Sequence, residues 1–175
     1  MTVQVTILGL GQIGGSIGLA LATQQEKITR IGHDKESEPA RAAKKNNVVD
    51  TVQVNLHSAV EGADVVILSM PLNEVRETLN LISTDLKEGV VVLDTSPARR
   101  QGEAWARELL PAGRHYVGLV PAIQRAHLLE TGGGLDGARA DLFQGANCLV
   151  CTIPGLPESA VRLATDLVNL LGATP

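Results

Sequence analysis

The sequence contains few aromatic residues, with one Trp, one Tyr and one Phe among 175 residues. Any hydrophobic core must therefore be built from Val, Leu, Ile and Ala. The sequence also has no excess of basic charge, since 15 Lys and Arg are outnumbered by 19 Asp and Glu. A net charge of -4 provides no basic surface for nucleic acid or for an anionic membrane. We therefore expect neither of these as a partner.

Long hydrophobic runs are absent as well. No stretch approaches the roughly 18 consecutive apolar residues that a transmembrane helix requires. The N-terminus has no basic region before its apolar run, and that run already has the pattern of a strand, so we do not expect a signal peptide. We expect a cytoplasmic protein. The apolar fraction of 44% is nevertheless sufficient for the core of one domain.

Cysteine is limited to Cys148 and Cys151. A Cys-x-x-Cys pair can indicate redox chemistry or half of a zinc site. The surrounding residues 146–153 have the pattern of a strand, however, and residues three apart on a strand point to opposite faces. The sequence offers no second cysteine pair to complete a metal site. We therefore expect structural cysteines and no bound metal.

The stretch 3–21 carries the main functional signal. It begins as an aliphatic strand, ends as an apolar helix, and has between them the turn Gly9-Leu10-Gly11-Gln12-Ile13-Gly14. This Gly-x-Gly-x-x-Gly spacing between a strand and a helix is typical of a dinucleotide site. Gly9 permits a tight turn, Gly11 allows the backbone to approach a pyrophosphate, and Gly14 allows helix and strand to pack closely. The helix N-terminus offers its N–H groups to the phosphates.

A second part of the same signal follows. Residues 28–33 have the pattern of the next strand, and Asp34 comes after it, twenty residues beyond Gly14. An acidic residue at this spacing accepts hydrogen bonds from the adenosine ribose. Because a carboxylate repels a 2′-phosphate, we predict NAD rather than NADP, although Lys35 would soften that preference. The alternative is a glycine-rich turn and a helix-capping Asp that bind no ligand.

Strands and helices alternate along most of the remaining chain. This alternation predicts an α/β fold of the Rossmann type, a doubly wound and mostly parallel sheet with helices on both faces. The expected strands are 48–52, 63–68, 89–93, 116–120 and 146–153, and the expected helical segments are 36–46, 57–62, 72–82, 97–110, 138–143 and 161–171.

Ligands of such a sheet lie beyond the carboxyl ends of the strands. We therefore predict that the cofactor is bound by residues that follow successive strands. These candidates are Gly9, Gly11, Gln12, Ile13, Gly14, Asp34, Lys35, Ser69, Met70, Pro71, Asp94 and Thr95.

The chain contains, in this order, the stretches ILGLGQIGGSIGLAL, GHD, VVD, EGADVVILSMPLNEV, VVVLDTS, HYVGLVP and ADLFQGANCLV. This series resembles the nucleotide-binding domain of prephenate dehydrogenases and of the related arogenate and cyclohexadienyl dehydrogenases. The resemblance spans essentially the whole chain. It implies NAD-dependent oxidative decarboxylation of prephenate or arogenate, a step of tyrosine biosynthesis.

Members of that family continue into a helical domain that dimerises and completes the substrate pocket. The resemblance therefore implies that residues 1–175 are the dinucleotide-binding domain alone. The helical domain is absent from this sequence, and the full-length protein is expected to be a homodimer that acts on a small molecule.

Two family motifs are altered here. The family has a His in a His-Pro pair after the sixth strand, and the matching position holds Val120, followed by Pro121. The family also has an Asp-x-x-Ser-x-Lys block, in which Pro97 takes the Ser position and Arg99 the Lys position. Valine transfers no proton, and loss of a general base costs about 10²- to 10⁴-fold in rate. We therefore expect this chain alone to be inactive.

Three residues are candidates to replace the missing groups. Ser96 lies one position before the family's Ser, His127 lies in the segment after the sixth strand, and His115 precedes that strand. Two alternative functions remain open at this point. One is a related NAD(P)-dependent dehydrogenase with a different acid as substrate, and the other is a non-catalytic NAD-binding regulatory module.

Overall fold

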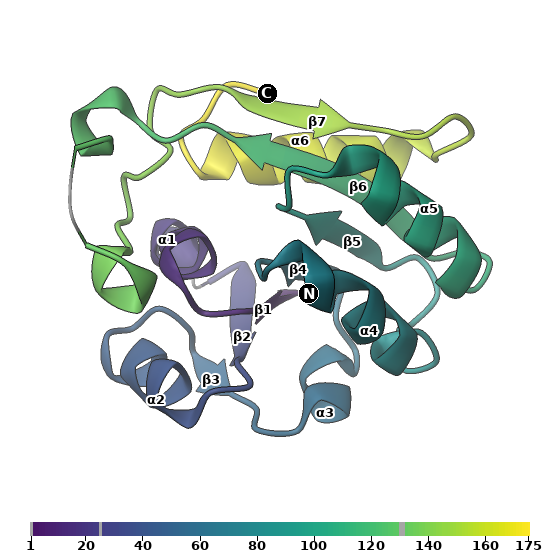
Figure 1. Cartoon of the computed structure of the whole chain (residues 1–175), viewed down its shortest axis with the longest axis horizontal. Helices are drawn as coiled ribbons and strands as arrows, with labels where there is room; N and C mark the ends of the chain where they lie inside the picture. Colours follow the sequence, from purple (N-terminus) through teal and green to yellow (C-terminus); the bar gives the residue numbers. More distant parts are fainter. Residues whose placement is uncertain (1, 25, 130–131) are drawn as a thin grey trace.

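The computed structural model describes residues 2–24, 26–129 and 132–175. Its centre is one seven-stranded sheet with the order β3-β2-β1-β4-β5-β6-β7 (Figure 1). The strands β1 to β6 run parallel, and β7 runs antiparallel to β6. The predicted doubly wound, mostly parallel sheet is confirmed. The strands are β1 (Val3–Leu8), β2 (Ile28–His33), β3 (Thr51–Val52), β4 (Val65–Leu68), β5 (Val91–Asp94), β6 (His115–Pro121) and β7 (Cys148–Cys151).

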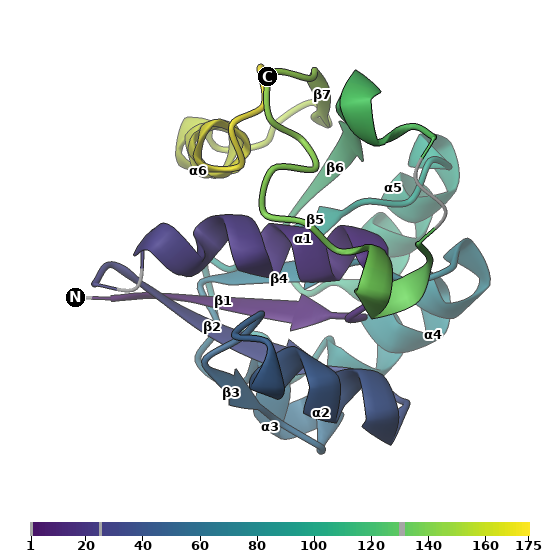
Figure 2. The same cartoon turned by 90° about the vertical axis from the view of Figure 1, so that its left-hand side faces the viewer.

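Helices cover both faces of the sheet (Figures 1 and 2). The side chains of α1, α2 and α6 pack into one core, and those of α3, α4 and α5 pack into the other. In the parts of the chain that the structure describes, no helix has the length and apolar character needed to span a membrane. The helices are α1 (Gln12–Ala20), α2 (Ser37–Lys45), α3 (Leu56–Val60), α4 (Leu72–Ile82), α5 (Arg99–Leu109) and α6 (Glu158–Leu170), with short 3-10 turns η1 (Leu21–Gln24), η2 (Arg125–His127) and η3 (Gly134–Gly137).

The aliphatic strands divide their side chains between these two cores. In β4, Val65 and Ile67 face the core on the α1 side, whereas Val66 and Leu68 face the core on the α4 side. All four are buried, which explains why β4 appears in the sequence as a continuous apolar run. As the composition predicts, both cores consist mainly of Val, Leu, Ile and Ala.

The strand predicted at 48–52 is much shorter than expected. Only Thr51–Val52 pairs with β2. Val48 and Val49 are buried in the core that α1 and α2 share, and the Val48 N–H donates to the Ala43 carbonyl in the last turn of α2. The apolar pair therefore completes the end of a helix and not the start of a strand.

The helix predicted at 138–143 is wrong. This segment forms successive turns, in which the Leu142 N–H donates to the Arg139 carbonyl and the Gln144 N–H donates to the Asp141 carbonyl. The turns place the adjacent side chains of Leu142 and Phe143 in the same core. The strand predicted at 146–153 is confirmed over the shorter range of β7.

A buried cation holds α1 against β2. Arg30 in β2 is 1% exposed, and its Nη2 lies 2.6 Å from Asp50 Oδ1. Its Nη1 donates to the carbonyls of Gly18 in α1 (2.8 Å), Asn47 (3.0 Å) and Val48 (3.1 Å). One guanidinium group therefore fixes the helix that begins at the glycine-rich turn.

Candidate functional site

The turn after β1 requires glycine at its first position. Gly9 has a φ of +93°, a conformation that residues with a side chain rarely adopt. A Cβ atom at Gly9 would also overlap the backbone oxygen of Ser69, at the carboxyl end of β4. The Gly9 N–H donates to the His33 carbonyl at 2.9 Å. The predicted tight turn is confirmed, and it lies between the ends of β2 and β4.

The other two glycines have opposite surroundings. A Cβ at Gly14 would overlap the Gly9 oxygen and lie 3.1 Å from Cγ2 of Ile7, which confirms the predicted close packing of helix on strand. A Cβ at Gly11 would have no atom within 4 Å. The fold therefore requires Gly9 and Gly14, whereas Gly11 borders open space. The space beside Gly11 is large enough to admit part of a ligand. The role of Gly11 in binding a cofactor stays a prediction.

The N-terminus of α1 faces this open space. Gly11 is its N-cap, no side chain caps it, and its first turn contains no acidic residue. The first N–H groups of a helix have no intrahelical acceptor, and they carry the positive end of the helix dipole. Gln12 and Ile13 supply two of these N–H groups, while the side chain of Ile13 packs against the core. An anion is thus the ligand that this helix end accommodates best.

Asp34 connects the glycine-rich turn to the end of β2. One carboxylate oxygen accepts a hydrogen bond from the Leu10 N–H at 2.8 Å, and the other accepts one from the Glu36 N–H at 2.9 Å. Each carboxylate oxygen retains a further lone pair. Asp34 therefore holds the shape of the turn and can still accept a hydrogen bond from a ligand hydroxyl.

A cleft of about 490 Å³ opens between the glycine-rich turn, the end of β2, the end of β4 and helix α4. Thr78 donates a hydrogen bond to Sδ of Met70 at 3.2 Å, which orients this methionine in the wall. The structure thus brings seven of the predicted cofactor residues together. The lining residues are Gly9, Gly11, His33, Asp34, Lys35, Leu56, Ser69, Met70, Pro71, Glu74, Glu77, Thr78 and Leu81.

Two acidic residues of this cleft were missed by the sequence analysis. Glu74 and Glu77 lie on α4, whereas all the predicted cofactor residues follow a predicted strand directly or belong to the glycine-rich turn. Nζ of Lys35 lies 2.6 Å from Oε1 of Glu74, so an ion pair joins the segment after β2 to α4 at the cleft. The hydrogen bond to Glu74 raises the pKa of Lys35, although desolvation opposes it. The sequence offered one signal for Glu74, because its place in the first turn after Pro71 puts it near the carboxyl end of β4.

Asp94, at the carboxyl end of β5, has a fully buried side chain. One of its oxygens accepts hydrogen bonds from the Tyr116 hydroxyl at 2.5 Å and from the Ser96 hydroxyl at 2.9 Å. The other accepts the Ser96 N–H at 2.8 Å. Burial and the neighbouring Asp94 raise the pKa of Tyr116, so its hydroxyl stays a neutral donor. Asp94 and Ser96 therefore face the protein interior, and Ser96 is only 4% exposed.

Arg99 and Thr95 lie beside this buried network. The Arg99 guanidinium donates to the Asp94 carbonyl at 2.8 Å and lies 3.4 Å from the Ser96 hydroxyl. It packs over Gly118 in β6, where a Cβ atom would overlap it. The Thr95 hydroxyl donates to the Leu68 carbonyl at 3.1 Å. The arginine thus places a positive charge between the carboxyl ends of β5 and β6.

The position that matches the family's His and the two histidine candidates lie in different places in the fold. Val120 is near the end of β6, where it pairs with Leu149 of β7. His127 is in η2, and its Nε2 lies 3.3 Å from Oδ1 of Asp141, with 9% of the side chain exposed. His115 was expected to precede β6 but is the first residue of this strand. It is therefore at the amino end of the sheet, away from the cleft.

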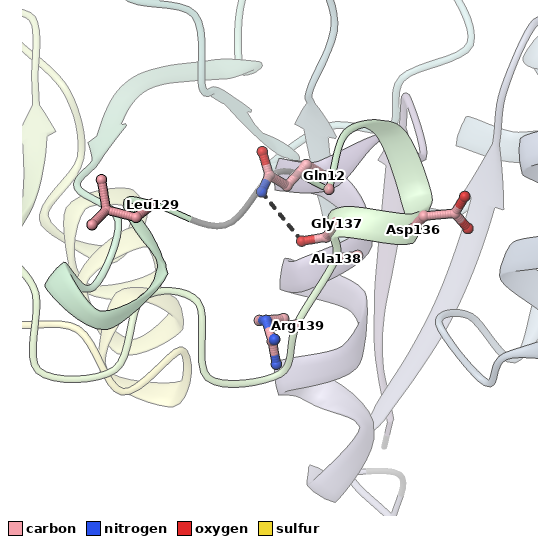
Figure 3. A pocket seen from close by; sticks show the side chains of 7 residues that line it. Gln12, Leu129, Asp136, Gly137, Ala138 and Arg139 are labelled. Carbon is pink, nitrogen blue, oxygen red and sulfur yellow. Dashed lines mark hydrogen bonds between the residues drawn. The ribbon is translucent and has the colours of Figure 1, made fainter.

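A second cavity, of about 570 Å³, lies beside the N-terminus of α1 (Figure 3). The segment after β6 returns across α1 and forms its other wall. The Gln12 side chain donates to the Gly137 carbonyl at 3.2 Å, and the Arg139 N–H donates to the Ser16 hydroxyl at 2.9 Å. The side chain of Gln12 therefore faces this cavity and not the cleft at Asp34.

The two cysteines lie on β7 and carry free thiols. Burial, together with the neighbouring Cys151, raises the pKa of Cys148 to about 11. Such a thiol is a poor nucleophile at neutral pH. Across the described ranges, no group of three or more His, Cys, Asp or Glu side chains could hold a metal ion.

Comparison with known proteins identifies related sequences. The family model for the nucleotide-binding domain of prephenate dehydrogenase matches residues 17–174. The prephenate dehydrogenase of Lactococcus lactis subsp. cremoris is 32% identical over 107 residues, which make up 61% of this chain and 30% of that protein. The prephenate dehydrogenase of Bacillus subtilis is 28% identical over 97% of this chain and 44% of its own length. The chain thus spans less than half of either relative.

Solved structures share the fold. The prephenate dehydrogenase of A. aeolicus, solved in complex with hydroxyphenyl propionate and NAD+, superposes with a TM-score of 0.81 at 20% identity. The superposition covers 99% of this chain and 59% of that chain. At this identity, the likeness establishes the fold.

Proposed function

The chain belongs to the family of prephenate dehydrogenase nucleotide-binding domains, and from this premise we propose that it binds NAD at the carboxyl edge of its sheet. One observation carries the proposal. Gly11 borders open space in front of an uncapped helix N-terminus, and it lines the same cleft as Asp34. The anion-binding end of a helix and a carboxylate for the ribose therefore share one cavity.

The pyrophosphate of the cofactor is assigned to the start of α1. The N–H groups of Gln12 and Ile13 are available there, and no acidic side chain in the first turn competes for them. A residue larger than glycine at position 11 would occupy the space that the phosphates need.

The adenosine half is assigned to the cleft of about 490 Å³. Asp34 is the acceptor for a ribose hydroxyl, because its two backbone bonds leave lone pairs on both oxygens. Leu56, Met70 and Leu81 supply apolar surface for the flat faces of a purine. These residues fit an adenine nucleotide.

The nicotinamide half is assigned to the region beyond the ends of β5 and β6. When bound, NAD supplies the acceptor for a hydride. Asp94 accepts hydrogen bonds from Ser96 and Tyr116, and these bonds fix the shape of the site beside the nicotinamide. Arg99 contributes a positive charge that favours a carboxylate substrate nearby.

The activity of the full-length protein is proposed from the family. Relatives are named prephenate dehydrogenase, and we assign the whole protein the NAD-dependent oxidation and decarboxylation of prephenate or arogenate. The resemblance further supports a cytoplasmic homodimer, joined by a helical domain outside these 175 residues.

The isolated chain is expected to bind NAD without catalysis. Val120 cannot transfer a proton, Ser96 is buried against Asp94, and His127 lies against Asp141. An open cleft also orients a substrate poorly and admits water. These observations favour the two alternatives to prephenate dehydrogenase activity. One is a related NAD(P)-dependent dehydrogenase with a different acid as substrate, and the other is a non-catalytic NAD-binding regulatory module.

Calorimetric titration with NAD tests the proposal. Gly11→Val should weaken binding by at least about tenfold, because the branched side chain enters the phosphate path. Gly133→Val is the matched control, since a Cβ at Gly133 also has no atom within 4 Å and this glycine does not have a positive φ. Both variants should keep the thermal stability of the unaltered chain. Equal NAD affinity in all three proteins would remove the glycine-rich turn as the site.

A further inference from the structure

The cleft contains a cation in the place where a second phosphate could be recognised. Lys35 follows Asp34, the proposed ribose ligand, and is the one Lys or Arg among the residues found to line the cleft. NADP differs from NAD by a 2′-phosphate on the same ribose. A dianionic phosphate in this position needs a cationic partner, and an exposed lysine is a common one. The side chain of Lys35 is 65% exposed and therefore accessible.

Lys35 already has an ion-pair partner, however. Its Nζ lies 2.6 Å from Oε1 of Glu74, whose side chain is 28% exposed. The backbone of Glu74 is fixed in the first turn of α4, where its N–H donates to the Pro71 carbonyl at 2.9 Å. The dipole of α4 favours an acidic residue at this position. The hydrogen bond to Glu74 also raises the pKa of Lys35, as a contact between the charged amine and a carboxylate should.

The surrounding charges add to this effect. Three carboxylates, Asp34, Glu74 and Glu77, line the cleft together with Lys35. These three carboxylates outnumber the one lysine, so the lining of the cleft has an excess of negative charge. A 2′-phosphate entering beside Asp34 would meet like charges and a lysine that has a partner.

We propose that Glu74 is a specificity-determining residue of the cofactor site, which excludes the 2′-phosphate of NADP by holding Lys35 in an ion pair. The proposal rests on the proposed NAD site, and it assigns a second exclusion element besides Asp34. Asp34 selects the ribose hydroxyl, and Glu74 pairs with the lysine that would otherwise bind a 2′-phosphate.

The expected effect follows from releasing Lys35. In Glu74→Gln, one negative charge is lost and the amine is freed to contact the phosphate. A charge-assisted hydrogen bond to a phosphate is stronger than a neutral one, but the lysine is exposed and solvent weakens its interactions. We expect NADP to bind about tenfold more tightly to Glu74→Gln than to the unaltered chain. NAD has no 2′-phosphate, so its affinity should rise less than that of NADP, and the ratio of the two affinities is the quantity that reports on Lys35.

Calorimetric titration of four proteins with NAD and NADP tests this account. They are the unaltered chain, Glu74→Gln, the double variant Glu74→Gln with Lys35→Gln, and Glu77→Gln. Glu77 is the matched control, because it lines the same wall and its replacement leaves the pair of Lys35 and Glu74 intact. AMP and adenosine 2′,5′-bisphosphate serve as a second pair of ligands that isolates the 2′-phosphate from the rest of the cofactor.

The outcomes separate this inference from the proposed function. A gain for NADP in Glu74→Gln that disappears in the double variant supports it. An equal gain in Glu77→Gln would assign the exclusion to net charge and overturn the role of the pair. If the unaltered chain binds NAD while Glu74→Gln still rejects NADP, the inference fails and the proposed function stands. If the unaltered chain binds neither dinucleotide, the proposed function fails and the inference fails with it.

Discussion

Replacement of Arg30 by methionine tests the packing that positions the glycine-rich turn. The guanidinium is 1% exposed and bonds to Asp50 and to the carbonyls of Gly18, Asn47 and Val48. Methionine preserves much of the side-chain volume but removes every bond that the guanidinium donates, so that from this position Asp50 keeps only the backbone N–H of residue 30, at 2.8 Å. Removing one partner of a buried ion pair costs about 3–5 kcal/mol.

The expected loss lies at the lower end of that range. The Asp50 side chain is 31% exposed, so water can solvate it after Arg30 is removed. We therefore expect Arg30→Met to lower the free energy of unfolding by about 3 kcal/mol. In a domain of this size, that corresponds to a fall of roughly 6–12 °C in Tm. Urea unfolding, followed by circular dichroism and by the fluorescence of Trp105, measures the loss.

The matched control is Arg162→Met on α6. Arg162 is 69% exposed and pairs with Glu158 one helical turn away, so its replacement should change stability by less than about 0.5 kcal/mol. A loss below about 1 kcal/mol for Arg30→Met would refute the reasoning, because it would show that the buried acceptors find other donors.

The ion pair of Arg30 and Asp50 also predicts that the stability of the chain depends on pH. Burial raises the pKa of Asp50, but the hydrogen bonds and charge of Arg30 outweigh it and hold this pKa below its usual value. A lowered carboxyl pKa stabilises the native state above the ordinary value of about 4, and this contribution disappears as the pH falls through the native pKa. The stability difference between Arg30→Met and the unaltered chain should therefore be largest near neutral pH and narrow below about pH 4.

Tyr116→Phe removes the hydroxyl that donates to the buried carboxylate of Asp94, so urea unfolding should show a loss of about 1–3 kcal/mol, and an unchanged midpoint would contradict the hydrogen bond. Gly14→Ala places a methyl group against the carbonyl of the glycine-rich turn, so calorimetry should show both a lower Tm and weaker NAD binding. Retention of both properties would show that the turn adapts. The 175-residue chain should form no NADH at a rate near that of full-length relatives when supplied with NAD and either prephenate or arogenate, since Val120 offers no base. Robust turnover would show that the catalytic groups have been assigned to the wrong residues.

The sequence predicted the sheet and the glycine-rich turn because these features depend on local patterns. Strands buried on both faces require continuous aliphatic runs, as in β4. The conformation of Gly9 and the packing of Gly14 depend on backbone shape, which the spacing of the glycines specifies. The position of Asp34 follows in the same way from the length of one helix and one strand.

Other features depend on contacts between distant elements and left little trace in the sequence. Glu74 meets Lys35 across the cleft although they are far apart in the chain. Tyr116 approaches Asp94 only because β5 and β6 pair in one register. Arg30 has the position of an ordinary strand residue, and its buried surroundings arise from the end of α2 and from α1. Tertiary packing, and not local preference, decides such positions.

A nuclear magnetic resonance titration of the isotope-labelled chain with NAD tests the central claim most directly. The account predicts that the backbone amides of the glycine-rich turn and of Asp34 shift on addition of NAD. A separate apolar groove of about 630 Å³ lies between the start of β1 and α6, at the amino ends of the strands. The amides around this groove should not shift. Shifts confined to that groove, through Val3, Leu163 and Leu170, would contradict the proposed site.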